Sequence, residues 1–423
     1  MIKLVLLVVF YLTFPLVIIT MCRKWSFFKK LGTVVMAYFF GLVMGNVGIL
    51  PKGSEAFRFA LQGRSVLPSG EMEGLLADGV LNQADQYVNQ IAGLQDIVLT
   101  LIVPLAIPML LLSLNIRRWF KLAGQGFLSM ILAFVSVVII ISTGYLIFGD
   151  MIPDGWKVAG LLTGVYTGGT PNLAAIRTAL DVDPSLFIMT HTYDLIIGAF
   201  TIIFFITAGR QVFGLVLPKF VKPEITGDTS DLVEEIEDMD DFTGMLNKRR
   251  LSGLLAATGI SLLIFAVSAG LSLVLTALPQ MVVVILAITT FGIIASLFRK
   301  INRIEKTFQL GMYLILIFSL VVSSMADLSI VFSIRYIHLF LFILYAYFGS
   351  MILHLLLSVI FKVDTDNFLI TTTALIYSPP FVPVVAAALR NKDVITTGLT
   401  VGIIGYVVGN YLAVPLAYLL RSL

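Results

Sequence analysis

Long apolar runs dominate the pattern of hydrophobic and polar positions along this chain. A helix needs roughly 20 apolar residues to cross about 30 Å of hydrocarbon. Because backbone groups in lipid must hydrogen-bond within their own segment, each run of this length is predicted to be a transmembrane helix. These runs lie at 3–21, 31–50, 97–115, 122–148, 185–208, 252–277, 281–298, 308–326, 335–361 and 395–420.

Two further apolar stretches, 157–180 and 367–389, are interrupted by glycine, proline and polar residues. The first contains Tyr166-Thr-Gly-Gly-Thr-Pro-Asn172, and the second contains Tyr377-Ser-Pro-Pro-Phe-Val-Pro383. Glycine favours unwinding, and proline removes a backbone donor and clashes with the preceding turn. Both stretches are therefore predicted to be broken helices.

Lysine and arginine in short loops predict the orientation, since they favour the cytoplasmic side. This rule places the N-terminus and the 51–95 loop outside, and the acidic connector 209–250 in the cytoplasm. A full crossing by 157–180 contradicts that placement, whereas a re-entrant hairpin agrees with it. We favour re-entrant elements at both broken stretches, with an extra crossing within 187–220 as the alternative. The basic loops are Arg23–Lys30, Arg117–Lys121 and Arg299–Lys306.

The order of elements repeats between residues 1–208 and 251–423. In each part an apolar helix precedes a long helix, then a broken stretch, then another helix. With the predicted orientations, this order indicates two inverted repeats, as in many secondary transporters. We therefore predict an all-α polytopic membrane protein of about 10–12 transmembrane helices, with a broken or re-entrant helix in each repeat.

Composition supports lipid as the solvent and excludes several functions. Hydrophobic residues make up 58% of the chain, charged residues 13%, and the mean hydropathy is +1.00. A net charge of +3 gives no reason to expect nucleic acid, and one cysteine and three histidines give no zinc-site spacing. No phosphate-binding loop or hydrolase motif is present, which argues against an ATP-driven pump or a recognisable hydrolase. No cofactor is expected beyond a coupling ion.

The first broken stretch is the strongest candidate for chemistry. Its freed backbone groups and polar side chains can bind a cation, or an anion at a half-helix N-terminus. A simple proline kink is the alternative. Its candidate residues are Thr167, Gly168, Gly169, Thr170 and Asn172, and the second stretch adds Tyr377 and Ser378.

Asp194 lies within an apolar helix, where a carboxylate is unfavourable unless it faces protein, water or a cation. It can exchange a proton or, with Asn172, bind sodium. A position near the membrane surface is the alternative. His191, Asp327 and Asn410 are secondary candidates.

At these residues the chain resembles the uncharacterised YjcL-like family of bacterial membrane proteins. The resemblance rests on Thr167-Gly-Gly-Thr-Pro-Asn172, Asp194, Ser324-Met-Ala-Asp327 and the glycine-rich last helix. That family resembles the cation:proton antiporters, bile-acid:sodium symporters and related anion transporters. The resemblance implies that Thr170, Asn172 and Asp194 lie near an ion and substrate site. The second broken stretch differs from the family's usual Asn/Gly-rich segment.

These features predict a secondary transporter of a small solute, with an organic anion favoured, coupled to sodium or protons. A cation:proton antiporter is the alternative within transport. An intramembrane enzyme, for which His191 with Asp194 is the one candidate pair, or a receptor subunit is the alternative of another class. We expect a multi-pass protein of the bacterial inner membrane. The sequence does not decide between a monomer and a homodimer.

Overall fold

A computed structural model describes residues 2–25, 28, 32–61, 66–113, 124–220, 242–245, 247–325, 336–391 and 393–423. Over these residues the regular structure is entirely helical, with no strand. The secondary candidate Asp327, the basic loop Arg117–Lys121 and residues 221–241 of the acidic connector lie outside the described residues.

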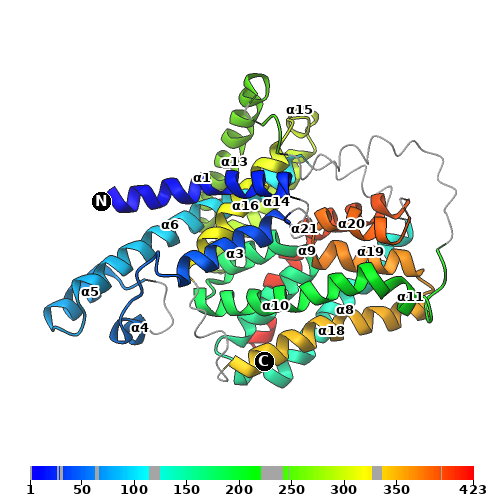
Figure 1. The fold of residues 1–423 in the computed structure, drawn as a ribbon, viewed down its shortest axis with the longest axis horizontal. Helices are drawn as coiled ribbons and strands as arrows, with labels where there is room; N and C mark the ends of the chain where they lie inside the picture. Colours follow the sequence, from blue (N-terminus) through cyan, green and yellow to red (C-terminus); the bar gives the residue numbers. More distant parts are fainter. Residues whose placement is uncertain are drawn as a thin grey trace. The chain divides into compact units, whose positions relative to one another are not determined.

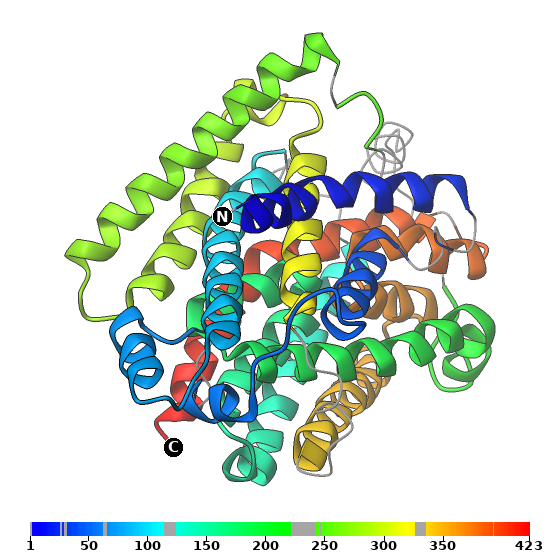
Figure 2. The same cartoon turned by 60° about the vertical axis from the view of Figure 1, so that its left-hand side comes forward.

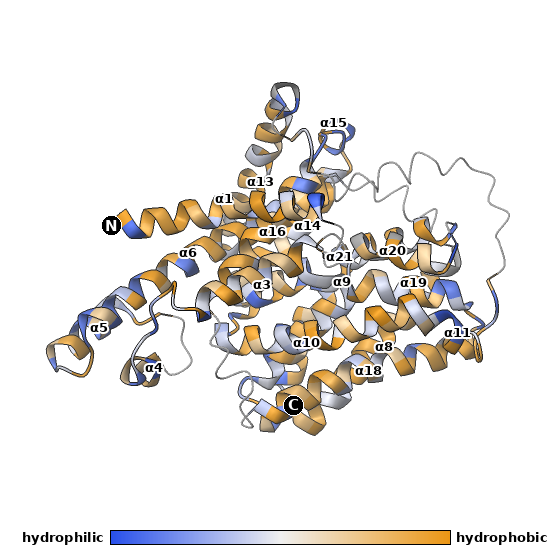
Figure 3. Ribbon diagram, in the orientation of Figure 1, coloured by the Kyte–Doolittle hydropathy of each residue, from blue (hydrophilic) through white to orange (hydrophobic). Residues whose placement is uncertain are grey.

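Eight helices in the described part of the chain are long and apolar enough to cross a membrane. Figure 3 shows α13 and α18 largely hydrophobic along their length, whereas hydrophilic residues gather at α11 and α15. Two shorter apolar helices, α3 (Thr33–Asn46) and α14 (Gln280–Ser296), accompany them. The predicted polytopic all-α class is thus confirmed. The eight are α1 (Ile2–Lys24), α6 (Gln83–Leu112), α8 (Gly124–Phe148), α10 (Pro184–Phe204), α13 (Lys248–Val274), α16 (Thr307–Ser324), α18 (Ile337–Ile360) and α21 (Asp393–Arg421).

The chain divides into two compact units that do not coincide with its sequential halves. Helices α6, α10 and α16 contribute residues to both units. Unit 1 comprises Met1–Val103, Val182–Met189 and Tyr313–Ile334, and unit 2 comprises Pro104–Asp181, Thr190–Met312 and Arg335–Leu423.

Buried polar contacts hold unit 1 together within its apolar helices. The Tyr11 hydroxyl lies 2.7 Å from Ser324 Oγ, and Gln95 Nε2 donates to both oxygens at 2.8 and 3.1 Å. Gly41 allows α3 to approach α16, because a Cβ there would overlap Ser323. Glycine at such a position permits close helix packing in a membrane.

The region 51–95, expected to be a polar loop, contains two short helices, α4 (Glu55–Leu61) and α5 (Ser69–Ala77), and the start of α6. The helix that contains the apolar run at 97–115 therefore begins earlier than the run itself, at Gln83. Asn82 explains the early start, because its Oδ1 accepts hydrogen bonds from the backbone N–H groups of Ala84 and Asp85 at 2.8 and 3.0 Å. Such a cap satisfies donors that the first turn leaves unpaired.

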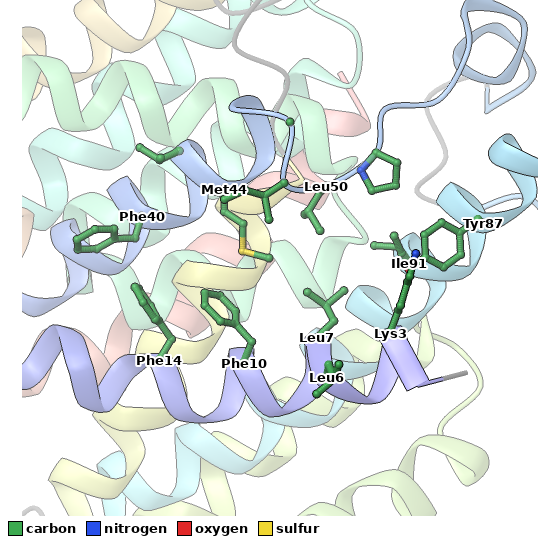
Figure 4. A pocket seen from close by; sticks show the side chains of 14 residues that line it. Lys3, Leu6, Leu7, Phe10, Phe14, Phe40, Met44, Leu50, Tyr87 and Ile91 are labelled. Carbon is green, nitrogen blue, oxygen red and sulfur yellow. The ribbon is translucent and has the colours of Figure 1, made fainter.

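Unit 1 also contains an apolar cavity of about 690 Å³ between α1, α3 and the first part of α6. Figure 4 shows Lys3 and Tyr87 at one end of the cavity and Phe14 and Phe40 at the other. Among the described residues that line the cavity, Lys3 is the one with a charge. The cavity therefore lacks the converging polar groups that fix a polar solute in a binding site.

In unit 2, α9 (Gly155–Leu180) is folded back on itself as a hairpin. Lys157 Nζ donates a hydrogen bond to the Asp181 carbonyl at 2.9 Å, so the two ends of the element lie together. A Cβ at Gly160 would lie 2.6 Å from Leu180 Cδ1, which brings the two arms into contact. The reversal occurs at Gly169, whose φ and ψ are 66° and −159°. This is the geometry that a re-entrant element requires.

A second hairpin follows α18 and consists of α19 (Thr365–Ile376), the 3₁₀ turn η4 (Pro379–Phe381) and α20 (Val382–Ala388). Asn391 Nδ2 donates to Asp366 Oδ2 at 2.8 Å, so the ends of this element also meet. The chain reverses at Ser378, which has φ 74° and ψ 161°. The alternative of an extra crossing within 187–220 is wrong, because one continuous helical stretch runs from Pro184 to Phe213.

Long helices surround the two hairpins of unit 2. Helix α21 packs against α9 and α19, and α18 packs against α8 (Figure 1). Helix α13 packs against α14, and the two are the neighbouring yellow-green helices of Figure 2. The hairpins are therefore enclosed by protein, as unwound backbone at membrane depth requires.

Candidate functional site

The tips of the two hairpins meet in unit 2. A Cβ added at Gly169 would overlap Ser378 Oγ, so the two reversal points are in direct contact. Gly168 is equally confined, because a Cβ there would lie 2.7 Å from the Gly405 carbonyl oxygen of α21. The structure thus brings together the two broken stretches that the sequence singled out.

Local sequence explains why both tips reverse here. The backbone angles of Gly169 belong to a region that is essentially restricted to glycine. Ser378 has a positive φ, which is uncommon for a residue with a side chain. Pro171 and Pro379 lie at the start of the second arms. In the first turn of a helix a backbone N–H has no intrahelical acceptor, so the N–H that proline lacks is not missed there.

The polar side chains of the first tip divide into two groups. Thr167 Oγ1 donates to the Thr163 carbonyl at 2.6 Å, and Asn172 Nδ2 donates to the Gly405 carbonyl at 2.9 Å. These two groups therefore stabilise the tip and its contact with α21. Thr170 is half-buried, and no residue in the described part of the chain hydrogen-bonds its hydroxyl.

Asp194 lies on α10, with 8% of its surface exposed. Its Oδ1 atom has no hydrogen-bond partner among the described residues, and the same holds for the buried hydroxyl of Tyr166. The two side chains are close enough to interact electrostatically. Since Tyr166 precedes the reversal at Gly169 by three residues, the carboxylate lies beside the first tip. A buried carboxylate oxygen that lacks a hydrogen bond is unfavourable and calls for a proton or a cation.

Two more tyrosines complete the surroundings of Asp194. The Tyr377 hydroxyl donates to the Gly198 carbonyl of α10 at 2.8 Å and lies 2.5 Å from the Tyr347 hydroxyl. The ring of Tyr347 packs edge-to-face on that of Tyr166, with centroids 5.5 Å apart. Both Tyr347 and Tyr377 interact electrostatically with Asp194. Sequence reasoning missed Tyr347, because a tyrosine in an apolar helix is indistinguishable from ordinary core.

The secondary candidates lie in different environments. His191 is buried on α10, one turn before Asp194. Asn410 Nδ2 donates to Thr289 Oγ1 at 3.3 Å and so ties α21 to α14. Asp327 lies outside the described residues.

The described ranges contain no group of three or more His, Cys, Asp or Glu residues that could hold a metal ion. The buried histidine of α18, His354, lies 3.2 Å from Ser129 Oγ and 3.3 Å from Thr372 Oγ1. Its two ring nitrogens are thus used to join α8, α18 and α19.

Comparison with known proteins agrees with this architecture. Residues 84–423 match the family described as "Protein of unknown function (DUF819)". The chain is also similar to the "Uncharacterized membrane protein YjcL" of Bacillus subtilis (strain 168), with 25% identity over 333 residues. The match covers 75% of this chain and 81% of the relative. Because the family match includes both hairpins and Asp194, the chain belongs to the DUF819 family of proteins.

Proposed function

We propose that this protein is a secondary transporter that moves a small organic anion together with sodium ions or protons. One observation carries the proposal: two hairpin tips meet beside a buried carboxylate that has no hydrogen-bond partner for Oδ1 in the described part of the chain. Many transporters place their sites where broken helices meet at the middle of the membrane. Two hairpins of this kind also agree with inverted repeats.

The first tip supports binding of an anion. The second arm of α9 begins there, so the partial positive charge of its N-terminal end is directed at the tip. Thr170 lies in this first turn and has a hydroxyl that is available to a ligand. A carboxylate group placed there gains backbone N–H donors and one side-chain donor.

Asp194 supports binding of the coupling ion. Its carboxylate and the hydroxyl oxygens around it are hard oxygen ligands, the kind that a sodium ion prefers, and a proton can occupy the same group. The Tyr377 hydroxyl and the Gly198 carbonyl hold the neighbouring backbone of α10 in place. Asp194 and Asn172 were both expected at a sodium site, and Asn172 acts here by fixing the tip.

Coupling follows from the charges of the two ligands. An ionised Asp194 repels a carboxylate substrate by about 4 kcal/mol at 4 Å, for an effective dielectric constant near 20. A bound sodium ion or proton removes this repulsion and raises the affinity for the anion. By linkage the anion raises the affinity for the cation by the same factor.

We further propose that the N-terminus lies outside the cell and that the basic segment Arg299–Lys306 faces the cytoplasm of a bacterium. The distribution of lysine and arginine supports this orientation. The membrane is then the inner membrane. We propose transport and not catalysis, because the chain offers no nucleophile-and-base motif.

Purified protein in lipid nanodiscs tests the proposal. Thermal unfolding would be followed with small mono-, di- and tricarboxylates, in sodium chloride and in choline chloride, and at two pH values. We expect at least one carboxylate to stabilise the protein in a sodium- or proton-dependent manner. Asp194→Asn should remove the ion dependence. Asp181→Asn is the matched control, because this exposed carboxylate at the end of α9 undergoes the same chemical change.

A cation:proton antiporter is a second candidate, favoured by the same carboxylate, which alone suffices for exchange of a cation against a proton. In proteoliposomes an antiporter would dissipate a pH gradient on addition of sodium without any organic anion. Wild-type behaviour of Asp194→Asn in both assays would exclude both candidates.

A further inference from the structure

A second polar cavity, of about 350 Å³, lies in unit 2 at the base of the second hairpin. It is bounded on one side by the π-helical turn η2 (Phe205–Gly209) and α11 (Arg210–Phe213), which extend α10. The other side is the C-terminal end of α20, the second arm of the hairpin. Its charged lining residues are Arg210 and Arg390.

The guanidinium of Arg210 is held in a fixed position. Its Nη1 donates to the Leu389 carbonyl at 2.6 Å, and its Nη2 donates to Asp366 Oδ2 at 3.1 Å. The Asp366 side chain is 1% exposed and also accepts a hydrogen bond from the side-chain amide of Asn391. Because a guanidinium has five N–H donors, Arg210 keeps donors for a ligand after making these bonds. Asp366 balances the charge of Arg210, so Arg390 leaves the cavity with a net positive charge.

Arg390 occupies a backbone position that favours glycine. Its φ is 53°, and its N–H donates to the Ala387 carbonyl at 3.0 Å, at the end of α20. Glycine is the usual residue where a helix ends in this left-handed conformation. Among the described residues, no carboxylate pairs with the exposed Arg390 side chain. A strained residue that lines a cavity and carries an unpaired charge indicates a function for that charge.

We propose that Arg210 and Arg390 form a binding site for an oxyanion, either a carboxylate or a phosphate group. The forked donors of arginine match both groups, and one immobilised guanidinium beside a second one can contact two oxygens of the same anion. The π-helical turn that forms one wall belongs to a class of irregularity often found at functional sites. The oxyanion can come from a soluble metabolite or from the head group of an anionic lipid.

This site is separate from Asp194. Arg210 follows Asp194 by 16 residues on a continuous helical stretch, which corresponds to about 24 Å. A cationic cavity at that distance raises the local concentration of an anion before it reaches the hairpin tips. This role in transport rests on the proposed function, whereas binding of the oxyanion does not.

Arg390→Gly tests the site, because glycine keeps the left-handed backbone and removes the charge. Full-length protein in phosphatidylcholine nanodiscs would be titrated calorimetrically with inorganic phosphate and with succinate, at constant ionic strength. A second arm would compare nanodiscs with and without phosphatidylglycerol and measure how much of this lipid is retained after delipidation. Arg421→Gln is the control, since it removes an exposed arginine that lies over the Trp156 ring at the other end of unit 2's last helix.

We expect Arg390→Gly to unfold at the wild-type temperature or above it, and to weaken binding of the anion roughly tenfold or more. Arg421→Gln should bind as the wild type does. If Arg390→Gly loses binding of the soluble anions only, the site binds a metabolite. If it loses retention of phosphatidylglycerol only, the site binds a lipid head group. Equal binding by Arg390→Gly and the wild type in both arms, or no binding by the wild type in either arm, would overturn the proposal. Failure of the transport proposal would instead appear in the thermal-unfolding assay, as an Asp194→Asn variant whose stabilisation by carboxylates keeps the wild-type ion dependence, with the Arg390→Gly result unchanged.

Discussion

Replacing Gly169 with alanine is the most direct test of the contact between the two hairpin tips. The residue has φ 66° and ψ −159°, a conformation that L-residues with a side chain adopt at a cost of about 1–3 kcal/mol. The added Cβ would also overlap Ser378 Oγ. Forcing an extra carbon into a packed site costs about another 1–3 kcal/mol. We therefore expect Gly169→Ala to lower the free energy of unfolding by about 2–6 kcal/mol.

A second substitution separates the two contributions. Ser378→Gly removes the hydroxyl that the new methyl group meets and relieves the positive φ of Ser378, so alone it should be neutral or stabilise by up to about 1 kcal/mol. In the Ser378→Gly background, Gly169→Ala should cost only the backbone strain. The coupling energy of the double-mutant cycle should then be about 1–3 kcal/mol.

Unfolding of the purified protein by sodium dodecyl sulfate in mixed micelles, followed by fluorescence, measures these differences. Gly259→Ala is the matched control: it lies on α13, and nothing stands within 4 Å of the position of its new Cβ. This control should be neutral or stabilise by up to about 1 kcal/mol. Equal stability of the Gly169→Ala and Gly259→Ala variants would refute the contact between the tips. A coupling energy near zero would refute the assignment of Ser378 as the partner.

Further predictions concern the site and the orientation. Asp194→Asn should abolish ion-coupled uptake into proteoliposomes while the protein stays folded, because an amide cannot replace a buried charge; unchanged uptake would remove Asp194 from the mechanism. Thr170→Val should weaken solute binding roughly ten- to a hundredfold with little loss of stability, as seen by titration calorimetry. Asn172→Leu should instead lower the unfolding free energy by about 1–3 kcal/mol, since it removes the buried hydrogen bond to the Gly405 carbonyl; a purely functional defect would contradict this assignment. In intact cells, a single cysteine at Lys219 should resist a membrane-impermeant thiol reagent, and its labelling would reverse the proposed orientation.

The hairpins could be predicted from sequence because the features that cause them are local. Gly169 and Pro171 stand within three residues of each other, and such a combination breaks a helix in any surroundings. Counting 157–180 as a full crossing also contradicts the orientation that the basic loops predict, and this conflict favours elements that enter and leave on the same side of the membrane. Asp194 could be selected for an equally local reason, since a carboxylate among apolar residues needs a partner.

The partners of these residues could not be predicted, because they are distant in sequence and chemically ordinary. The Gly405 carbonyl that accepts the hydrogen bond from Asn172 is a backbone group, so no side chain in the sequence identifies it as the partner. Tyr347 looks like core, and Arg210 and Asp366 look like ordinary charges at the ends of apolar stretches. Their pairing depends on two chain reversals whose positions must be known to within a residue.

The hydrogen bond from Asn172 to the Gly405 carbonyl also has a consequence for biogenesis. The two residues are 233 positions apart in the chain. At synthesis rates of about 5–20 residues per second, the first hairpin exists for roughly 10–50 s before its partner on α21 leaves the ribosome. During this interval the Asn172 amide and the unwound tip have no acceptor from α21 and cannot face lipid without a large penalty. During insertion, the first hairpin therefore requires a water-filled or protein-lined environment, such as the insertion machinery itself, until the last helix is in the membrane.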